Sequence, residues 1–304
     1  MKIPQLTAVI IGVIGVLNCQ TVFAETDANP QPSLVEERVN KELQASDNPF
    51  VIMPHKVNYF LPITYSSSPN TTPFAAEMEQ GDYALDHAEA KFQISFKFPL
   101  AYKVFGDNGH LFFAYTNQSW WQVYNKNSSS PFRETNHEPE LFMLFNNDWK
   151  IGDFTNSFFG FGAVHQSNGR SGSLSRSWNR VYGNMVFDNG PMAFSLKVWW
   201  RIPESDKKYD GDPHGDDNPD IEDYLGHFEF TALYGPGKHR FSLMLRNNLK
   251  TSNNRGAAQL TWSYPILGNL RIYAQYFNGY GESLIDYNAH TERIGLGVAL
   301  NDLL

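Results

Sequence analysis

The sequence has almost no cysteine, few charges and no long apolar run, and each absence excludes a class of protein. Its one cysteine is Cys19, so the fold does not depend on disulfide bonds. Charged residues make up 18% of the 304 residues, too few for a coiled coil or a long disordered tail. No stretch reaches the roughly 18 uninterrupted apolar residues of a membrane-spanning helix. The formal net charge of -8 argues against a nucleic-acid binder.

Aromatic residues, in contrast, are abundant: they make up 15% of the chain, with 23 Phe, 15 Tyr and 7 Trp. The mean hydropathy of -0.42 is nevertheless that of a soluble protein. The two properties together are typical of a membrane β-barrel, because its strands alternate lipid-facing and lumen-facing residues and average out to polar.

Residues 1–24 are typical of a secretory signal peptide. After a basic second residue they carry an apolar run, Ala8–Leu17, that is too short to span a bilayer. A small-x-small cleavage site, Val22–Ala24, follows. Cys19 lies inside this segment, and a lipoprotein reading of it is weak because Asn18 stands where a small residue is expected. The sequence therefore predicts an exported bacterial envelope protein.

Two further segments follow the signal peptide. Residues 25–48 are acidic and polar and show no strand pattern, so we expect a loosely ordered periplasmic arm with a short helix near Leu34–Leu43. Residues 49–304 alternate in polarity and are predicted to form a single domain.

The alternation is strict in several places. One run sets large apolar residues against polar ones: Phe92, Ile94, Phe96 and Phe98 against Lys91, Gln93, Ser95 and Lys97. The same pattern recurs at residues 194–201, 227–232 and 293–300. Such alternation places one set of side chains on each face of a β-strand.

Two architectures produce this pattern: a soluble sandwich with its apolar face inside, and a membrane barrel with its apolar face in lipid. The signal peptide and the aromatic residues near strand ends favour the membrane, where such rings gather at the interfaces: Trp120, Trp121, Trp199, Tyr234 and Tyr280. We therefore predict an all-β fold, a transmembrane antiparallel β-barrel of about twelve strands. The long polar segment Glu204–Asp223 should be a loop outside the bilayer.

The most unusual polar residues lie on a predicted lipid face. His165 and Ser167 are two positions apart, so they share one face of a strand with Phe159 and Phe161. Asn179 shares its face with apolar residues of the next alternating segment. An unsatisfied amide or hydroxyl facing hydrocarbon costs roughly 2 kcal/mol or more, which suggests that these three side chains satisfy one another.

Serine, histidine and a residue that orients the imidazole through its other ring nitrogen are the parts of a nucleophilic hydrolase. The alternative is that His165 and Ser167 merely sit at the interfacial end of a strand. A bare H-x-S match does not decide between the two readings.

Several sequence blocks resemble the active-site region and other parts of bacterial outer-membrane phospholipase A, the detergent-resistant phospholipase A family. They are H-Q-S-N-G-R-S (His165–Ser171) with S-R-S-W-N-R-V-Y (Ser175–Tyr182), S-W-W-Q (Ser119–Gln122), S-S-P-F-R-E-T-N-H-E-P (Ser129–Pro139), D-D-N-P-D-I (Asp216–Ile221) and G-Y-G-E-S-L-I-D-Y-N (Gly279–Asn288). The blocks run in order through most of the chain after residue 24.

The resemblance implies a twelve-stranded barrel of the Gram-negative outer membrane that hydrolyses sn-1 and sn-2 acyl esters of phospholipids, and lysophospholipids as well. Ser167 would be the nucleophile, His165 the general base and then acid, and Asn179 the residue that fixes the imidazole. The family requires Ca²⁺, and its active form is a homodimer with sites at the subunit interface.

Carried over by position, the calcium ligands are the carbonyl of Arg170, the hydroxyl of Ser175 and Ser129 of the partner subunit. The backbone amide of Gly169 and a calcium-bound water would form the oxyanion hole. The family pattern also implies a second, weaker calcium at Asp217, for which an ordinary acidic surface loop is an equal alternative. Without the resemblance, the sequence around Ser129 and Ser175 would indicate only ordinary turns.

Two residues depart from the family pattern. Gly172 stands where family members can carry an acidic residue, which weakens the case for the second ion. The sequence closes on Leu304, whereas many outer-membrane barrels end in an aromatic residue.

The rival from another class is a barrel without chemistry, a pore or a structural protein. The predicted inward charges could pair across the lumen and plug it, or stand apart around water: Lys91, Lys97, Lys197, Arg201, Glu229, Arg246, Arg271 and Arg293. An inactive relative of the family is a third alternative, which the presence of His165, Ser167 and Asn179 disfavours.

Overall fold

The computed structural model describes residues 33–46, 51–75, 85–209, 212 and 214–301. The predicted signal peptide, Cys19 and Leu304 lie outside the described residues. No helix within the described ranges has both the length and the apolar character needed to cross a membrane.

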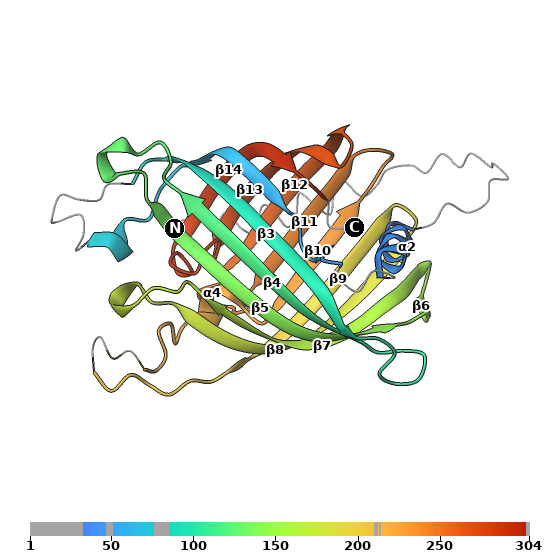
Figure 1. Cartoon of the computed structure of the whole chain (residues 1–304). Helices are drawn as coiled ribbons and strands as arrows, with labels where there is room; N and C mark the ends of the chain where they lie inside the picture. Colours follow the sequence, from blue (N-terminus) through green and yellow to red (C-terminus); the bar gives the residue numbers. More distant parts are fainter. Residues whose placement is uncertain (1–32, 47–50, 76–84, 210–211, 213, 302–304) are drawn as a thin grey trace. The chain divides into compact units, whose positions relative to one another are not determined.

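Twelve long strands within the described residues form a closed antiparallel ring (Figure 1). They are β2 (Tyr59–Ser66), β3 (Ala88–Ala101), β4 (His110–Trp121), β5 (Phe132–Asn146), β7 (Phe154–Ser167), β8 (Ser177–Asn189), β9 (Met192–Ile202), β10 (Phe228–Tyr234), β11 (Arg240–Asn247), β12 (Gly256–Leu267), β13 (Leu270–Tyr280) and β14 (His290–Ala299). Each pairs with its neighbours, and β14 pairs with β2 to close the ring. The predicted twelve-stranded barrel is confirmed.

Short elements accompany the ring. Two short strands of two residues each pair with strands of the ring: β1 (Met53–Pro54) with β3, and β6 (Lys150–Ile151) with β7. In the described part of the chain the helices are α2 (Leu34–Ser46) and α4 (Glu222–Leu225), with 3₁₀ turns η1 (Thr72–Phe74), η2 (Lys126–Ser128) and η3 (Gly172–Leu174).

The burial of β3 shows which face of the strands points outward. Lys91 and Lys97 are buried, whereas Ile94 between them is 54% exposed. On β14, Arg293 is likewise buried and Ile294 is 59% exposed. Large apolar side chains therefore cover the outer wall and charged ones point into the lumen, which is the arrangement of a membrane barrel and not of a soluble sandwich.

Charged side chains inside the barrel are paired. Lys91 and Arg293 both contact Glu282, at 2.9 and 2.8 Å, and Arg293 also reaches Glu89 at 2.8 Å. Burial of the Glu282 carboxyl, on the β13–β14 connection, would raise its pKa, but Arg293 and Lys91 hold that pKa at about 2.

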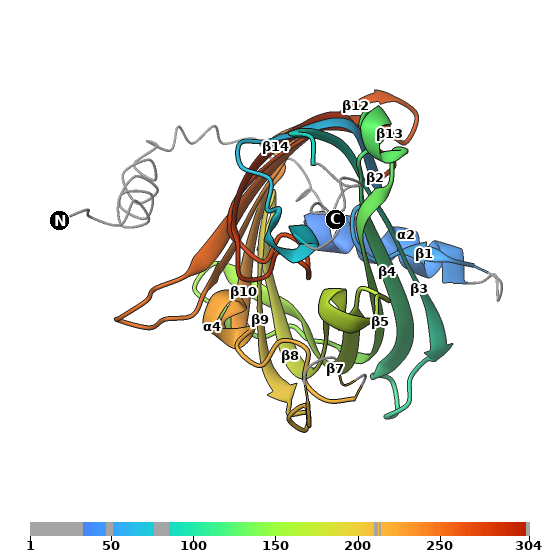
Figure 2. The same cartoon turned by 90° about the vertical axis from the view of Figure 1, so that its left-hand side faces the viewer.

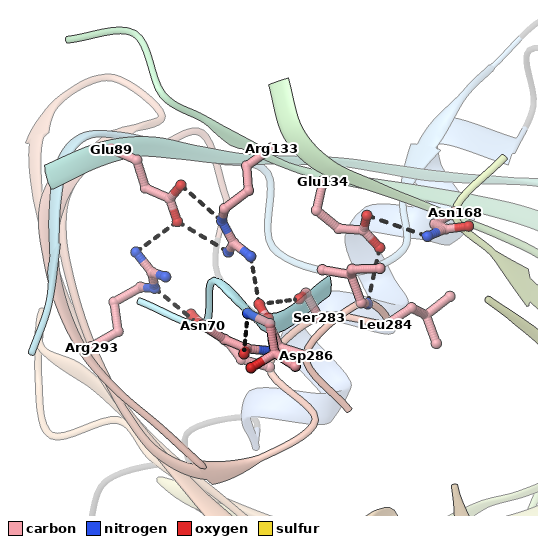
Figure 3. A network of polar contacts seen from close by, with 12 residues as sticks. Asn70, Glu89, Arg133, Glu134, Asn168, Ser283, Leu284, Asp286 and Arg293 are labelled. Atoms are coloured by element: carbon pink, nitrogen blue, oxygen red, sulfur yellow. Dashed lines mark hydrogen bonds and ion pairs between the residues drawn. The ribbon is translucent and has the colours of Figure 1, made fainter. Parts of the chain in front are cut away.

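A second set of pairs fixes the β13–β14 connection inside the barrel (Figure 3). Arg133 of β5 bridges Glu89 of β3, at 3.1 Å, and Asp286, at 2.5 Å. Five residues of the predicted inward set make ion pairs in the structure: Lys91, Lys97, Lys197, Arg201 and Arg293. Lys91, Lys197 and Arg293 pair with carboxylates inside the barrel, whereas Lys97 pairs with Glu42 of α2 and Arg201 with Asp216 of the β9–β10 loop. A cavity of about 470 Å³ remains.

Helix α2 lies against the end of the barrel with the short turns (Figure 1). Ser33 and Glu36 form a reciprocal capping box at its start, with bonds of 3.1 and 2.8 Å. Leu34 is buried and its amide donates to Gly190 O in the β8–β9 turn, while Glu42 pairs with Lys97 at 2.9 Å. The short helix predicted in the arm is therefore present, and it is docked.

The β4–β5, β7–β8 and β9–β10 connections lie at the opposite end, which faces the viewer in Figure 2. The β13–β14 connection lies at the same end, but it is buried inside the barrel. The predicted site residues all lie at this end of the barrel: at the end of β7, near the start of β8, or in these loops.

Candidate active site

His165 and Asn179 are joined by a direct hydrogen bond on the outer wall. They are cross-strand partners in the β7–β8 pairing, and His165 Nδ1 donates to Asn179 Oδ1 at 2.8 Å. An amide oxygen in that position fixes the tautomer, because the proton on Nδ1 leaves Nε2 with its lone pair. The imidazole is therefore prepared to accept a proton at Nε2.

The surroundings of this pair are apolar and exposed, as the alternation predicts. On the same face of β7 and β8, Phe161 is 48% exposed, Val181 43% and Met185 40%. The polar pair thus lies near the β7–β8 loop, at the edge of an apolar surface that a lipid bilayer would cover.

Ser167 is the last residue of β7 and lies on the same face as His165. Its cross-strand partners are Ser177 on β8 and His137 on β5. Within the described residues its hydroxyl makes no hydrogen bond, so the structure brings together His165 and Asn179 and leaves the Ser167–His165 bond unmade. Catalytic hydrogen bonds are often long in ligand-free proteins and tighten around the substrate.

Asn168 organises the loop that follows Ser167. Its side chain donates to Leu174 O at 2.8 Å and accepts from the amides of Arg176, at 3.0 Å, and Arg170, at 3.3 Å. Its own amide donates to Arg176 O at 3.0 Å. The loop between Ser167 and Ser177 is therefore built around one buried amide side chain.

Glu134 anchors that loop to the barrel (Figure 3). Its carboxylate, fully buried on β5, accepts from Asn168 Nδ2 at 3.3 Å and lies 3.6 Å from Arg170 Nε. The other carboxylate oxygen accepts from Asn136 at 2.6 Å and from the Ile285 amide at 3.1 Å. Through Glu134 the loop after Ser167 is tied to both β5 and the β13–β14 connection.

Gly169 is shaped for the predicted oxyanion role. It is exposed and has φ +65°, a left-handed conformation that disfavours residues with a Cβ. No acceptor within the described residues pairs with its amide, which is two residues beyond Ser167. A backbone N–H without a protein acceptor can donate to a developing oxyanion.

The predicted calcium ligands lie in three loops: Ser129 in the β4–β5 loop, Arg170 and Ser175 in the β7–β8 loop, and Asp217 in the β9–β10 loop. Ser175 donates its hydroxyl proton to Asp217 Oδ2 at 2.5 Å, which leaves oxygen lone pairs for a cation. The guanidinium of Arg170 donates to the carbonyls of Phe132 and Arg133, at 3.1 and 2.6 Å, so its backbone is held beside β5.

Ser129 follows η2 in the β4–β5 loop, exposed and with φ +56°. Its amide donates to Lys126 O at 3.4 Å, and within the described chain no hydrogen bond joins it to Arg170 or Ser175. No group of three or more His, Cys, Asp or Glu in the described ranges is placed to hold a metal. The donors present are neutral hydroxyl and carbonyl oxygens, which suit a hard cation that keeps several waters.

Asp217 also has a second contact. Lys207 lies 2.5 Å from its Oδ1, so both carboxylate oxygens have partners in the structure. A second calcium at Asp217 would have to displace this lysine.

Three residues near the site carried no predicted role: Glu134, Asn168 and Glu204. Asn168 and Glu134 alternate with outward residues and so point inward. The alternation pattern singles out polar residues on the outward face, where His165 and Ser167 lie, and it therefore misses these two. Glu204, which accepts from Asn179 Nδ2 at 3.2 Å, belongs to a segment that was predicted only as an external loop.

Comparisons with known proteins identify relatives that cover most of the chain. The sequence profile of the family described as Phospholipase A1 matches residues 35–300. Phospholipase A1 of Proteus vulgaris is 42% identical over 261 residues, covering 86% of this chain and 85% of its own length. Phospholipase A1 of Escherichia coli K12 is 39% identical over 277 residues, or 91% of each chain.

Solved structures show the same likeness. Outer membrane phospholipase A from Escherichia coli superposes with a TM-score of 0.76 at 39% identity, covering 84% of this chain and all of that one. A Salmonella typhi outer membrane phospholipase, crystallised as a dimer with bound calcium, gives a TM-score of 0.77 at 37% identity over 86% of this chain and 97% of that one.

Proposed function

Since the chain belongs to the phospholipase A1 family, we propose that it hydrolyses the sn-1 and sn-2 acyl esters of phospholipids, and lysophospholipids, in a calcium-dependent reaction. The protein is an enzyme, and its barrel is an outer-membrane barrel of the Gram-negative type. Its active form is a homodimer with the sites at the subunit interface.

The observation that carries the proposal is the His165–Asn179 bond on the lipid-facing wall, beside Ser167. Ser167 Oγ attacks the ester carbonyl while His165 Nε2 takes its proton, and the imidazolium then gives that proton to the departing alcohol. Water repeats the sequence on the acyl-enzyme, which releases the fatty acid and restores Ser167. A site on the outer wall meets acyl esters at the edge of the bilayer.

The negative charge that forms on the carbonyl oxygen needs donors. The Gly169 amide is one, and Asn168 with Glu134 keeps the loop that carries it in place. Calcium, when bound by the Arg170 carbonyl, the Ser175 hydroxyl and Ser129 of the partner subunit, supplies positive charge beside that oxygen. The calcium-bound Salmonella typhi dimer supports both the metal and the homodimer.

Replacing Ser129 by alanine tests the shared metal site. Because one oxygen ligand is lost, we expect the calcium concentration for half-maximal fatty-acid release to rise roughly tenfold, the equivalent of about 1.4 kcal/mol, with the barrel still folded. Ser128→Ala, one residue earlier in the same loop, should leave the calcium concentration for half-maximal release unchanged. A Ser129→Ala titration that coincides with the wild type would remove Ser129 from the site.

A direct measurement of calcium binding to the same protein samples gives the number of ions bound per chain. A second calcium at Asp217 remains part of the proposal, and it predicts an additional weak ion per chain that Asp217→Asn abolishes. One ion class, unchanged by Asp217→Asn, would mean that Lys207 keeps this carboxylate.

A further inference from the structure

The Asn179 side chain is held at both ends. Its oxygen accepts from His165, and its Nδ2 donates to Glu204 Oε1 at 3.2 Å. Asn179 pairs across the strands with Ile202, and Glu204 lies two residues further along the chain, on the same side. The four side chains Ser167, His165, Asn179 and Glu204 therefore follow one another across β7, β8 and the end of β9.

Strand β9 ends at Ile202, and Glu204 is the second residue of the β9–β10 loop, directly after Pro203. Its side chain is half-buried, and within the described residues it forms no ion pair. Asn179 is the hydrogen-bond partner that the structure gives it. Its negative charge is therefore not neutralised by a contacting lysine or arginine in the described part of the chain.

Two physical consequences follow from this contact. An asparagine amide can flip and present its NH₂ group to the imidazole, but a carboxylate accepting from Nδ2 holds the oxygen toward His165. Asparagine is also neutral, so it stabilises an imidazolium less than the aspartate of a Ser-His-Asp triad. A carboxylate directly behind the amide supplies part of that missing charge.

We propose that Glu204 is a positioning residue for the reaction: it orients Asn179 and, through it, stabilises the protonated state of His165 that forms while Ser167 attacks. This inference rests on the proposed function, because it assigns a role within the same catalytic group.

Other charged or titratable groups surround the site, and a test has to distinguish their effects from that of Glu204. His137 of β5 lies opposite Ser167 and close to Gly169. Arg170 and Arg176 come from the β7–β8 loop, where both donate to backbone carbonyls. Lys207, in the same loop as Glu204, is paired with Asp217.

The test compares Glu204→Gln with Glu204→Ala. Glutamine keeps an oxygen that can accept from Asn179 but removes the charge, whereas alanine removes both. We expect kcat to fall about threefold for Glu204→Gln and about tenfold for Glu204→Ala, with KM little changed. The acidic limb of the rate profile should move to lower pH by about 0.3–0.5 units in Glu204→Gln, because protonation of the imidazole loses a nearby negative charge.

Asp206→Asn is the matched control, since it removes one exposed carboxylate from the same loop without touching Asn179. It should leave both kcat and the acidic limb unchanged. Wild-type kcat in Glu204→Ala, an unshifted acidic limb in Glu204→Gln, or an equal shift in Asp206→Asn would each overturn the proposal. Ser167→Ala is measured beside them: residual wild-type activity there would instead count against the proposed function itself.

Discussion

Replacing His165 by glutamine is expected to lower kcat by roughly 10⁴-fold or more, with the barrel still folded. Glutamine is similar in size and can still contact Asn179, but it cannot take the Ser167 proton. Without a base, the serine hydroxyl is a poor nucleophile at neutral pH. Wild-type activity should also fall on acidification, since histidine side chains charge between about pH 8 and 5 and an imidazolium accepts no proton.

His137→Gln is the matched control for this prediction. His137 is the cross-strand partner of Ser167 on β5, and its Nδ1 lies 2.6 Å from the Tyr115 hydroxyl. The account gives it no proton transfer, so its replacement should change kcat by only a few-fold. Comparable losses in the two variants, or a rate independent of pH in the acidic range, would contradict the general-base role of His165.

Arg133→Met is expected to destabilise the barrel by roughly 3–5 kcal/mol, the largest stability effect we predict. Its guanidinium is buried between Glu89 and Asp286, at 3.1 and 2.5 Å. Removing it leaves two buried carboxylates without this partner, and the β13–β14 connection loses its ion pair with β5 (Figure 3). The hydrogen bonds that the backbone of that connection donates to Asn136 and Glu134 of β5 remain. Glu89 keeps Arg293, so the loss falls most heavily on Asp286.

The measurement is the denaturant concentration at which the barrel unfolds in detergent. Arg133→Lys is the control: it keeps the charge but not the forked geometry that reaches both carboxylates, so it should cost less than Arg133→Met. A midpoint for Arg133→Met equal to that of the wild type would show that the lumen pairs do not hold the loop.

The strand architecture could be predicted from sequence because alternation has a direct physical meaning. Burial of Lys91 beside an exposed Ile94 is the arrangement that period-two patterning implies once the apolar side faces lipid. His165, Ser167 and Asn179 became candidates for the same reason: they are polar residues at positions where the pattern calls for apolar ones.

Contacts between distant segments could not be predicted in this way. Arg133 and Asp286 are 153 residues apart, and no local pattern indicates that they meet inside the barrel. Asn168 and Glu134 follow the ordinary inward parity, so their position behind the loop that follows Ser167 appears only once the strands are closed. The pairing of Asn179 with Ile202, which places Glu204 beside the amide, depends on the strand register.

The most direct test of the account is fatty-acid release from phospholipid–detergent micelles by the wild type and by Ser167→Ala, each with calcium and with chelator. Ser177→Ala, which replaces the cross-strand neighbour of Ser167, is the matched control. The account predicts release by the wild type and Ser177→Ala in calcium, and none by the wild type in chelator or by Ser167→Ala in either condition. Calcium-independent release, or release by Ser167→Ala at the wild-type rate, would contradict it.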